Sequence, residues 1–163
     1  MTQQSATVVG GGIMGTGIAQ VLARNGYDVS VRELNDELVG EARERLISGN
    51  YGLDDAVEGG YLSEDERDEV VDRVTFTTDL ADATNGTDFV IEAVTEDLAV
   101  KGQVFRNLND VTDDQPLYSN TSGYFGSLDC ERRLRSLESC RHSLLQPGSS
   151  HVHGRDCTGT GDE

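Results

Sequence analysis

The chain has 163 residues, enough for one domain with a single substantial core. Thirty acidic residues against one lysine and twelve arginines give a net charge of −17, which argues against nucleic acid and anionic membranes as partners because both would be repelled. No apolar run approaches the ~20 residues of a membrane span and the first residues do not resemble a signal peptide, so we expect a cytoplasmic protein.

A glycine-rich turn follows the first predicted strand, Ala6–Val9, and leads into a predicted helix over Gly15–Asn25 that Gly26 closes. The turn spans residues 10–15 (GGGIMG) and fits the pattern G-x-G-x-x-G. Glycine triplets also occur in plain tight turns, which is the alternative interpretation. The strand before and the helix after this turn favour the dinucleotide-binding fingerprint.

The glycines of this turn have separate roles. Gly10 permits the tight turn, Gly12 lets the backbone approach a pyrophosphate, and Gly15 allows the helix to pack closely on the strand. The unpaired N–H groups at the helix start then face the diphosphate. The cofactor-binding residues predicted in the turn are Gly10, Gly12, Ile13, Met14 and Gly15.

A carboxylate follows the second predicted strand, Asp28–Arg32. Glu33 stands eighteen residues after Gly15, where it would accept hydrogen bonds from the adenosine ribose and repel a 2′-phosphate. NAD is therefore favoured over NADP. Strand alternation directs Arg32 away from Glu33, so we interpret it as a surface charge and not as a phosphate ligand.

The remaining predicted elements alternate between helix and strand. A polar helix runs from about residue 35 to 48 with Asn35 or Asp36 as N-cap, and the S-x-x-E spacing at Ser63 predicts a capping box that opens a helix to about residue 71. This alternation predicts an α/β fold, a doubly wound Rossmann-type parallel sheet. The later strands are predicted at Val74–Thr77, Asp88–Val94 and Pro116–Ser119, with a helix over Glu96–Val111.

The composition changes after residue 123. Residues 1–123 hold 24 of the 30 acidic residues, whereas all three cysteines and all three histidines fall within residues 124–163. We therefore expect a dinucleotide-binding domain over 1–123 and a poorly ordered tail over 124–163, which shows no sustained period. The spacing of its cysteines and histidines fits no standard zinc pattern, so no metal is predicted.

Three segments resemble 3-hydroxyacyl-CoA dehydrogenases. They are Val8–Ala19 (VVGGGIMGTGIA), Asp88–Lys101 (DFVIEAVTEDLAVK) and Ser119–Gly123 (SNTSG). Their order and spacing are similar to the NAD-binding domain of that family over residues 6–123. The resemblance implies an oxidoreductase that converts a 3-hydroxyacyl-CoA to a 3-oxoacyl-CoA with NAD, as in fatty-acid β-oxidation.

The resemblance also implies roles for individual residues. Glu96 and Lys101 match positions beside the nicotinamide-ribose end of the cofactor, and Asn120 matches a cofactor contact. Ser122 matches the serine that binds the 3-oxygen of the substrate. Residue chemistry alone would make Glu96 and Lys101 an exposed pair at a helix start, and SNTSG a polar loop.

The sequence departs from the family after residue 123. The family continues with a segment like H-F/Y-x-N-P, which contains the general base, and with a later glutamate, and neither is present here. Our hypothesis is that the tail is translated out of frame, because permitted codons re-read from their second base give a family-like sequence. The histidine then falls at the position of Ser143, the asparagine at Gln146 and the glutamate at Arg155.

The family's C-terminal helical domain, which completes the acyl-CoA site and forms the dimer, has no room in 163 residues. We therefore expect the chain as written to bind NAD without turning over substrate, and its oligomeric state stays open. One alternative is a β-hydroxyacid dehydrogenase of the hydroxyisobutyrate type, which the I-E-A-V-x-E and S-N-T-S patterns disfavour. The other is a non-catalytic NAD-binding module with a genuine tail.

The acid excess has two interpretations. An ordinary acidic cytosolic protein is one. The other is a halophilic protein, since near 1 M salt the Debye length is about 3 Å and self-repulsion is tolerated. The presence of a single lysine favours the halophilic interpretation.

Overall fold

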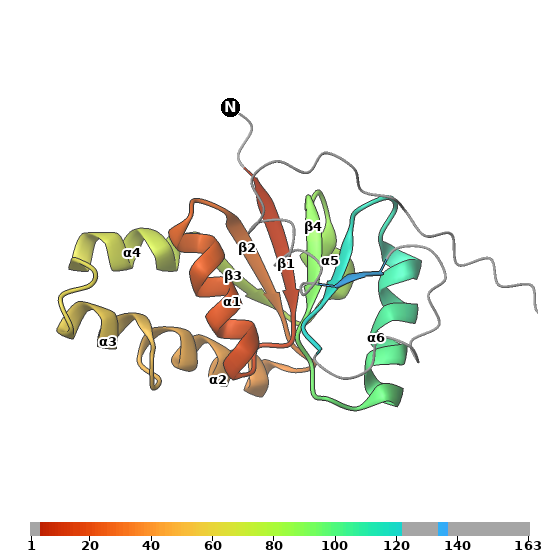
Figure 1. Ribbon diagram of the computed structural model, residues 1–163, viewed down its shortest axis with the longest axis horizontal. Helices are drawn as coiled ribbons and strands as arrows, with labels where there is room; N and C mark the ends of the chain where they lie inside the picture. The colour runs from red at the N-terminus through yellow and green to blue at the C-terminus, as the bar shows by residue number, and fades with distance from the viewer. Residues whose placement is uncertain (1–3, 122–133, 137–163) are drawn as a thin grey trace, which may run out of the picture.

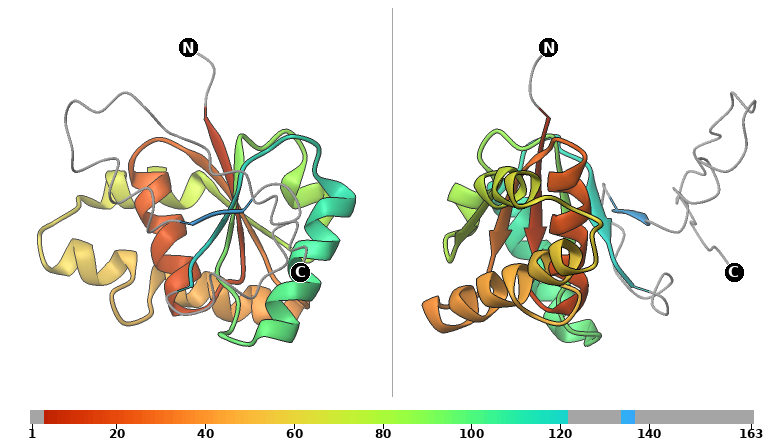
Figure 2. Two further views of the ribbon diagram at one scale, coloured as in Figure 1. Left: turned by 45° about the vertical axis from the view of Figure 1, so that its right-hand side comes forward. Right: turned by 90° about the vertical axis from the view of Figure 1, so that its left-hand side faces the viewer.

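A computed structural model describes residues 4–121 and 134–136 of the chain. It shows a parallel sheet in the order β3-β2-β1-β4-β5-β6, with helices on both faces (Figures 1 and 2). The predicted doubly wound α/β fold is confirmed. The strands are β1 (Ser5–Val9), β2 (Asp28–Arg32), β3 (Val74–Thr77), β4 (Phe89–Glu92), β5 (Leu117–Ser119) and β6 (Leu134–Ser136).

Two apolar clusters join the helices to the two faces of the sheet. Val8 packs in one cluster and Val9 in the other, because successive side chains of a strand point to opposite faces. The first cluster includes residues of α1, α2, α3 and α4, and the second includes residues of α6. The helices are α1 (Ile13–Arg24), α2 (Asp36–Ile47), α3 (Leu53–Glu58), α4 (Glu64–Asp72), α5 (Leu80–Thr84) and α6 (Leu98–Val111).

Three predicted helix ends are confirmed, whereas α1 begins at Ile13 and α6 at Leu98 instead of at the predicted Gly15 and Glu96. Asn35 caps α2 by accepting from the N–H of Leu38. Ser63 and Glu66 form the full capping box of α4, with the Ser63 N–H 2.8 Å from the Glu66 carboxylate. That backbone hydrogen bond, together with the one from the Ser63 hydroxyl, holds the pKa of Glu66 below its usual range. Gly26 has a φ of +89° after α1, as its predicted position requires.

Three short elements were not predicted. α3 and α5 have six and five residues, too few to show a helical period. β6 falls within the tail, where we expected no element, and its three residues pair in parallel with β5. The tail's cysteines and histidines lie outside the described residues, as do Ser122, Ser143, Gln146 and Arg155.

Among the described helices, none combines the length and the apolar character needed to cross a bilayer.

Candidate functional site

The order of strand addition changes side between β1 and β4. From β1 the chain adds β2 and β3 on one side, and it then returns to add β4 on the other side of β1. Strands β1 and β4 are neighbours, with Val9 opposite Glu92, and their following connections lead to helices on opposite faces. In open α/β sheets a ligand binds in the crevice beyond the carboxyl ends of such strands. Gly10 follows β1 and Ala93 follows β4, so the glycine-rich turn borders this crevice.

The geometry of the turn explains its glycines. Gly10 has a φ of +103°, and a Cβ there would lie 2.8 Å from the carbonyl oxygen of Ala93. A Cβ on Gly15 would lie 1.7 Å from the carbonyl oxygen of Gly10, so only glycine permits this approach of α1 to the turn. A Cβ on Gly12 would meet no atom within 4 Å, which leaves open space above the backbone.

The start of α1 is suited to an anion. Its N-cap is Gly12, which has no side chain to satisfy the first N–H groups, and no acidic residue lies in the first turn. Ile13 and Met14 are exposed at 77% and 58%. The open backbone and the free N–H groups together fit the diphosphate of a dinucleotide.

Glu33 lies against the same turn. Its Oε1 accepts from the N–H of Gly11 at 2.5 Å, and its Oε2 accepts from the N–H of Leu34 at 3.1 Å. Arg32 instead donates to the carbonyl oxygen of Thr78 at 3.2 Å, on the side of the β3–α5 connection. Glu33 and Arg32 therefore have different hydrogen-bond partners. Arg45 of α2 donates to the carbonyl oxygen of Gly11 at 2.7 Å and so ties α2 to the turn.

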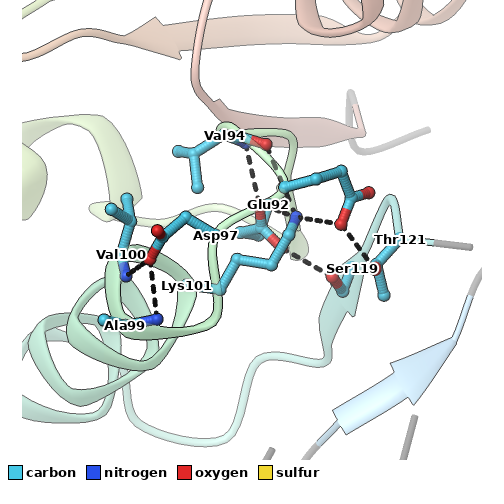
Figure 3. A network of polar contacts seen from close by, with 9 residues as sticks. Glu92, Val94, Asp97, Ala99, Val100, Lys101, Ser119 and Thr121 are labelled. Atoms are coloured by element: carbon cyan, nitrogen blue, oxygen red, sulfur yellow. Dashed lines mark hydrogen bonds and ion pairs between the residues drawn. The ribbon is translucent and has the colours of Figure 1, made fainter. Parts of the chain in front are cut away.

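A buried ion pair lies at the carboxyl end of β4 (Figure 3). The Lys101 Nζ lies 2.8 Å and 3.0 Å from the two oxygens of Glu92, and both side chains are fully buried. An exposed position for Lys101, the expectation from residue chemistry alone, is therefore wrong. The expectation failed because α6 begins at Leu98, behind the N-cap Asp97, which turns Lys101 inward toward β4.

Glu96 is the exposed member of this cluster. Its Oε2 accepts from the Thr121 hydroxyl at 2.9 Å and lies 3.9 Å from the Lys101 Nζ. Asn120 is placed beside β4 by the hydrogen bond from its N–H to the carbonyl oxygen of Glu92. The structure therefore brings Glu96, Lys101 and Asn120 together at the carboxyl ends of β4 and β5.

Sequence reasoning missed Glu92, Ser119 and Thr121. Glu92 interrupts an apolar strand, and Ser119 faces it in the parallel register of β4 and β5. The signal that could have identified Glu92 is its charge, because a lone carboxylate in a strand buried on both faces needs a partner. Ser119 and Thr121 carry no such signal.

A pocket of about 530 Å³ lies on the other side of α1, toward α2. Its lining includes Thr16, Gln20, Arg45 and Tyr51. Among the described residues that line it, Ile13 is the only predicted site residue. The pocket therefore adjoins the glycine-rich turn at Ile13, and the rest of its lining comes from α1, α2 and the residues that follow α2.

Residues 5–127 match the family described as 3-hydroxyacyl-CoA dehydrogenase, NAD binding domain. The chain belongs to this family. A 3-hydroxybutyryl-CoA dehydrogenase of Mycobacterium tuberculosis is 45% identical over 121 residues, which are 73% of this chain and 41% of that protein. The mitochondrial hydroxyacyl-coenzyme A dehydrogenase of Sus scrofa is 29% identical over 119 residues, 71% of this chain and 38% of that protein.

Solved structures agree with this assignment. FadB2 of M. tuberculosis superimposes with a TM-score of 0.69 at 45% identity, over 75% of this chain and 42% of that one. The 3-hydroxybutyryl-CoA dehydrogenase of Escherichia coli K12 gives 0.66 at 32% identity, over 75% and 25%. The chain spans about two fifths of the length of the curated relatives it matches. It thus comprises the NAD-binding domain of a 3-hydroxyacyl-CoA dehydrogenase, and NAD is its cofactor.

Proposed function

We propose that this domain is the cofactor half of an enzyme that oxidises 3-hydroxyacyl-CoA to 3-oxoacyl-CoA in fatty-acid breakdown. The observation that carries the proposal is the placement of two carboxylates, one after β2 and one after β4, on either side of β1, which leads into the glycine-rich turn. Glu33 lies against the N–H of Gly11, whereas Glu96 lies beyond the ends of β4 and β5. A dinucleotide has a ribose on each side of its diphosphate, and each ribose presents hydroxyl donors to a carboxylate.

The proposed binding mode assigns each residue to a part of the cofactor. The diphosphate meets the backbone of Gly12 and the start of α1, with Gly10 and Gly15 shaping the turn and Ile13 and Met14 exposed beside it. Glu33 binds the adenosine ribose and disfavours a 2′-phosphate. The nicotinamide side meets Glu96, Lys101 and Asn120.

Held by Glu33, Glu96, Lys101 and Asn120, NAD would supply the hydride acceptor for C3 of the substrate, and the protein would supply position and electrostatics. By its resemblance to the family, Ser122 binds the substrate's 3-oxygen. Hydride transfer also needs a general base that titrates near neutral pH. This base is usually a histidine, and residues 1–123 contain no histidine. We therefore expect the 163-residue chain by itself to hold NAD without oxidising acyl-CoA. A cytoplasmic location and adaptation to high salt also stay predictions.

The test combines a titration with an assay. Isothermal titration calorimetry of the full chain should show NAD binding and much weaker NADP binding, and the chain should not oxidise NADH in the presence of acetoacetyl-CoA. A chain that binds neither nucleotide would contradict the proposed cofactor site. Turnover of acetoacetyl-CoA would contradict the expected inactivity and would place a general base in the tail.

A further inference from the structure

The proposed binding mode gives Glu92 no contact with NAD, yet both oxygens of its carboxylate accept two hydrogen bonds each. Its Oε1 accepts from the Lys101 ammonium at 2.8 Å and from the N–H of Val94 at 2.7 Å. Its Oε2 accepts from the ammonium at 3.0 Å and from the Ser119 hydroxyl at 2.5 Å. A fully buried glutamate is rare unless paired, and this one joins β4, β5 and α6 (Figure 3).

The position of the Lys101 ammonium is fixed by these contacts. It has three donors, and it reaches both oxygens of Glu92 and, at 3.4 Å, the carbonyl oxygen of Val94. In the absence of the Glu92 charge, a buried ammonium would have no carboxylate closer than Glu96, at 3.9 Å. The location of the positive charge at the nicotinamide side therefore depends on Glu92.

That charge in turn orients Glu96. The ammonium and the Thr121 hydroxyl both approach Oε2 of Glu96, and within the described residues these contacts leave Oε1 unused. The exposed carboxylate is thereby held with one oxygen anchored and one oxygen available to accept from a ligand hydroxyl.

We propose that Glu92 is a positioning residue for NAD. It fixes the Lys101 ammonium, which together with Thr121 holds Glu96 toward the ribose on the nicotinamide side. The inference rests on the proposed function, because it concerns the same cofactor, and it adds a buried residue that acts through its neighbours without touching the ligand.

The first experiment uses Glu92→Gln in the full chain, with the exposed Glu69→Gln of α4 as matched control. Calorimetry with NAD and with ADP separates the two ends of the cofactor, since ADP lacks the nicotinamide riboside. We expect Glu92→Gln to weaken NAD binding about tenfold, as for loss of one charge-assisted contact, and to change ADP binding less than about twofold. Glu69→Gln should change neither.

The second experiment asks whether Glu92 acts through Lys101. Glu92→Gln combined with Lys101→Met should bind NAD as weakly as Glu92→Gln alone, because the ammonium is already displaced in the single variant. A further loss of about fivefold or more would show that Lys101 acts without Glu92 and would overturn the inference.

Further outcomes would also overturn it. One is an equal loss of affinity for NAD and for ADP in Glu92→Gln, which would indicate only a damaged fold. The other is an unchanged affinity for NAD in Glu92→Gln. If Glu92→Gln does not fold, Ser119→Ala removes one contact of the carboxylate at smaller cost, and it should still weaken NAD binding more than ADP binding. A Ser119→Ala chain that binds both as the wild type does would overturn the inference. A wild-type chain that binds neither nucleotide would instead refute the proposed function.

Discussion

The two ends of the candidate NAD site are built differently. At the adenosine end, Glu33 is half exposed and accepts two backbone hydrogen bonds from Gly11 and Leu34. At the nicotinamide end, a fully buried pair of Glu92 and Lys101 joins two strands and a helix. The first end depends on hydrogen bonds from backbone N–H groups to a half-exposed carboxylate, and the second depends on charge compensation in the core. Substitutions at the adenosine end should therefore alter the affinity for NAD, whereas substitutions at the nicotinamide end should also alter the free energy of unfolding.

The largest effect is expected from Lys101→Met. Removal of the ammonium leaves the Glu92 carboxylate buried without a counter-charge, which typically costs about 3–5 kcal/mol of unfolding free energy. Urea unfolding followed by circular dichroism measures this loss. The double variant Lys101→Met, Glu92→Gln buries no uncompensated charge and should recover most of it. A double variant as unstable as the single one would show that lost packing, and not charge, stabilises this end.

The same contrast explains what could be predicted from the sequence. The glycine pattern of the turn, the Asn35 cap and the Ser63 capping box each occupy a few consecutive positions, so they are visible in the chain. The side-chain partners of Glu92 lie 9 and 27 residues away: Lys101 reaches it from α6, and Ser119 meets it because β4 and β5 pair in parallel register. Sequence reasoning therefore located Lys101 and Glu96 by resemblance but did not identify what holds them.

A pair of glycine variants tests the local character of the turn. In Gly15→Ala the new Cβ meets the carbonyl oxygen of Gly10, and the clash should cost about 1–3 kcal/mol of stability or more. In Gly12→Ala the Cβ enters open space, so unfolding should change by less than about 1 kcal/mol, as for an N-cap substitution. NAD binding should nevertheless weaken in Gly12→Ala, because the methyl group occupies the approach of the diphosphate.

Thermal unfolding and NAD titration of both glycine variants distinguish these effects. If Gly12→Ala binds NAD as tightly as the wild type, the diphosphate does not approach the backbone at Gly12, and the proposed placement of the cofactor on the turn is wrong.

The smallest expected change in stability is that of Glu33→Gln, which keeps an oxygen able to accept from the N–H of Gly11, loses the acceptor of the exposed Leu34 N–H, and should lower the unfolding free energy by about 0.5 kcal/mol. Its effect falls on the ligand. Loss of the charge should weaken NAD binding about tenfold and narrow the preference over NADP, because the carboxylate no longer repels a 2′-phosphate. Calorimetry with both nucleotides, with the exposed Glu37→Gln as control, measures the ratio. An unchanged ratio of NAD affinity to NADP affinity would mean that Glu33 stabilises the glycine-rich turn without contacting the cofactor. The adenosine end would then resemble the nicotinamide end, where the buried pair stabilises the fold.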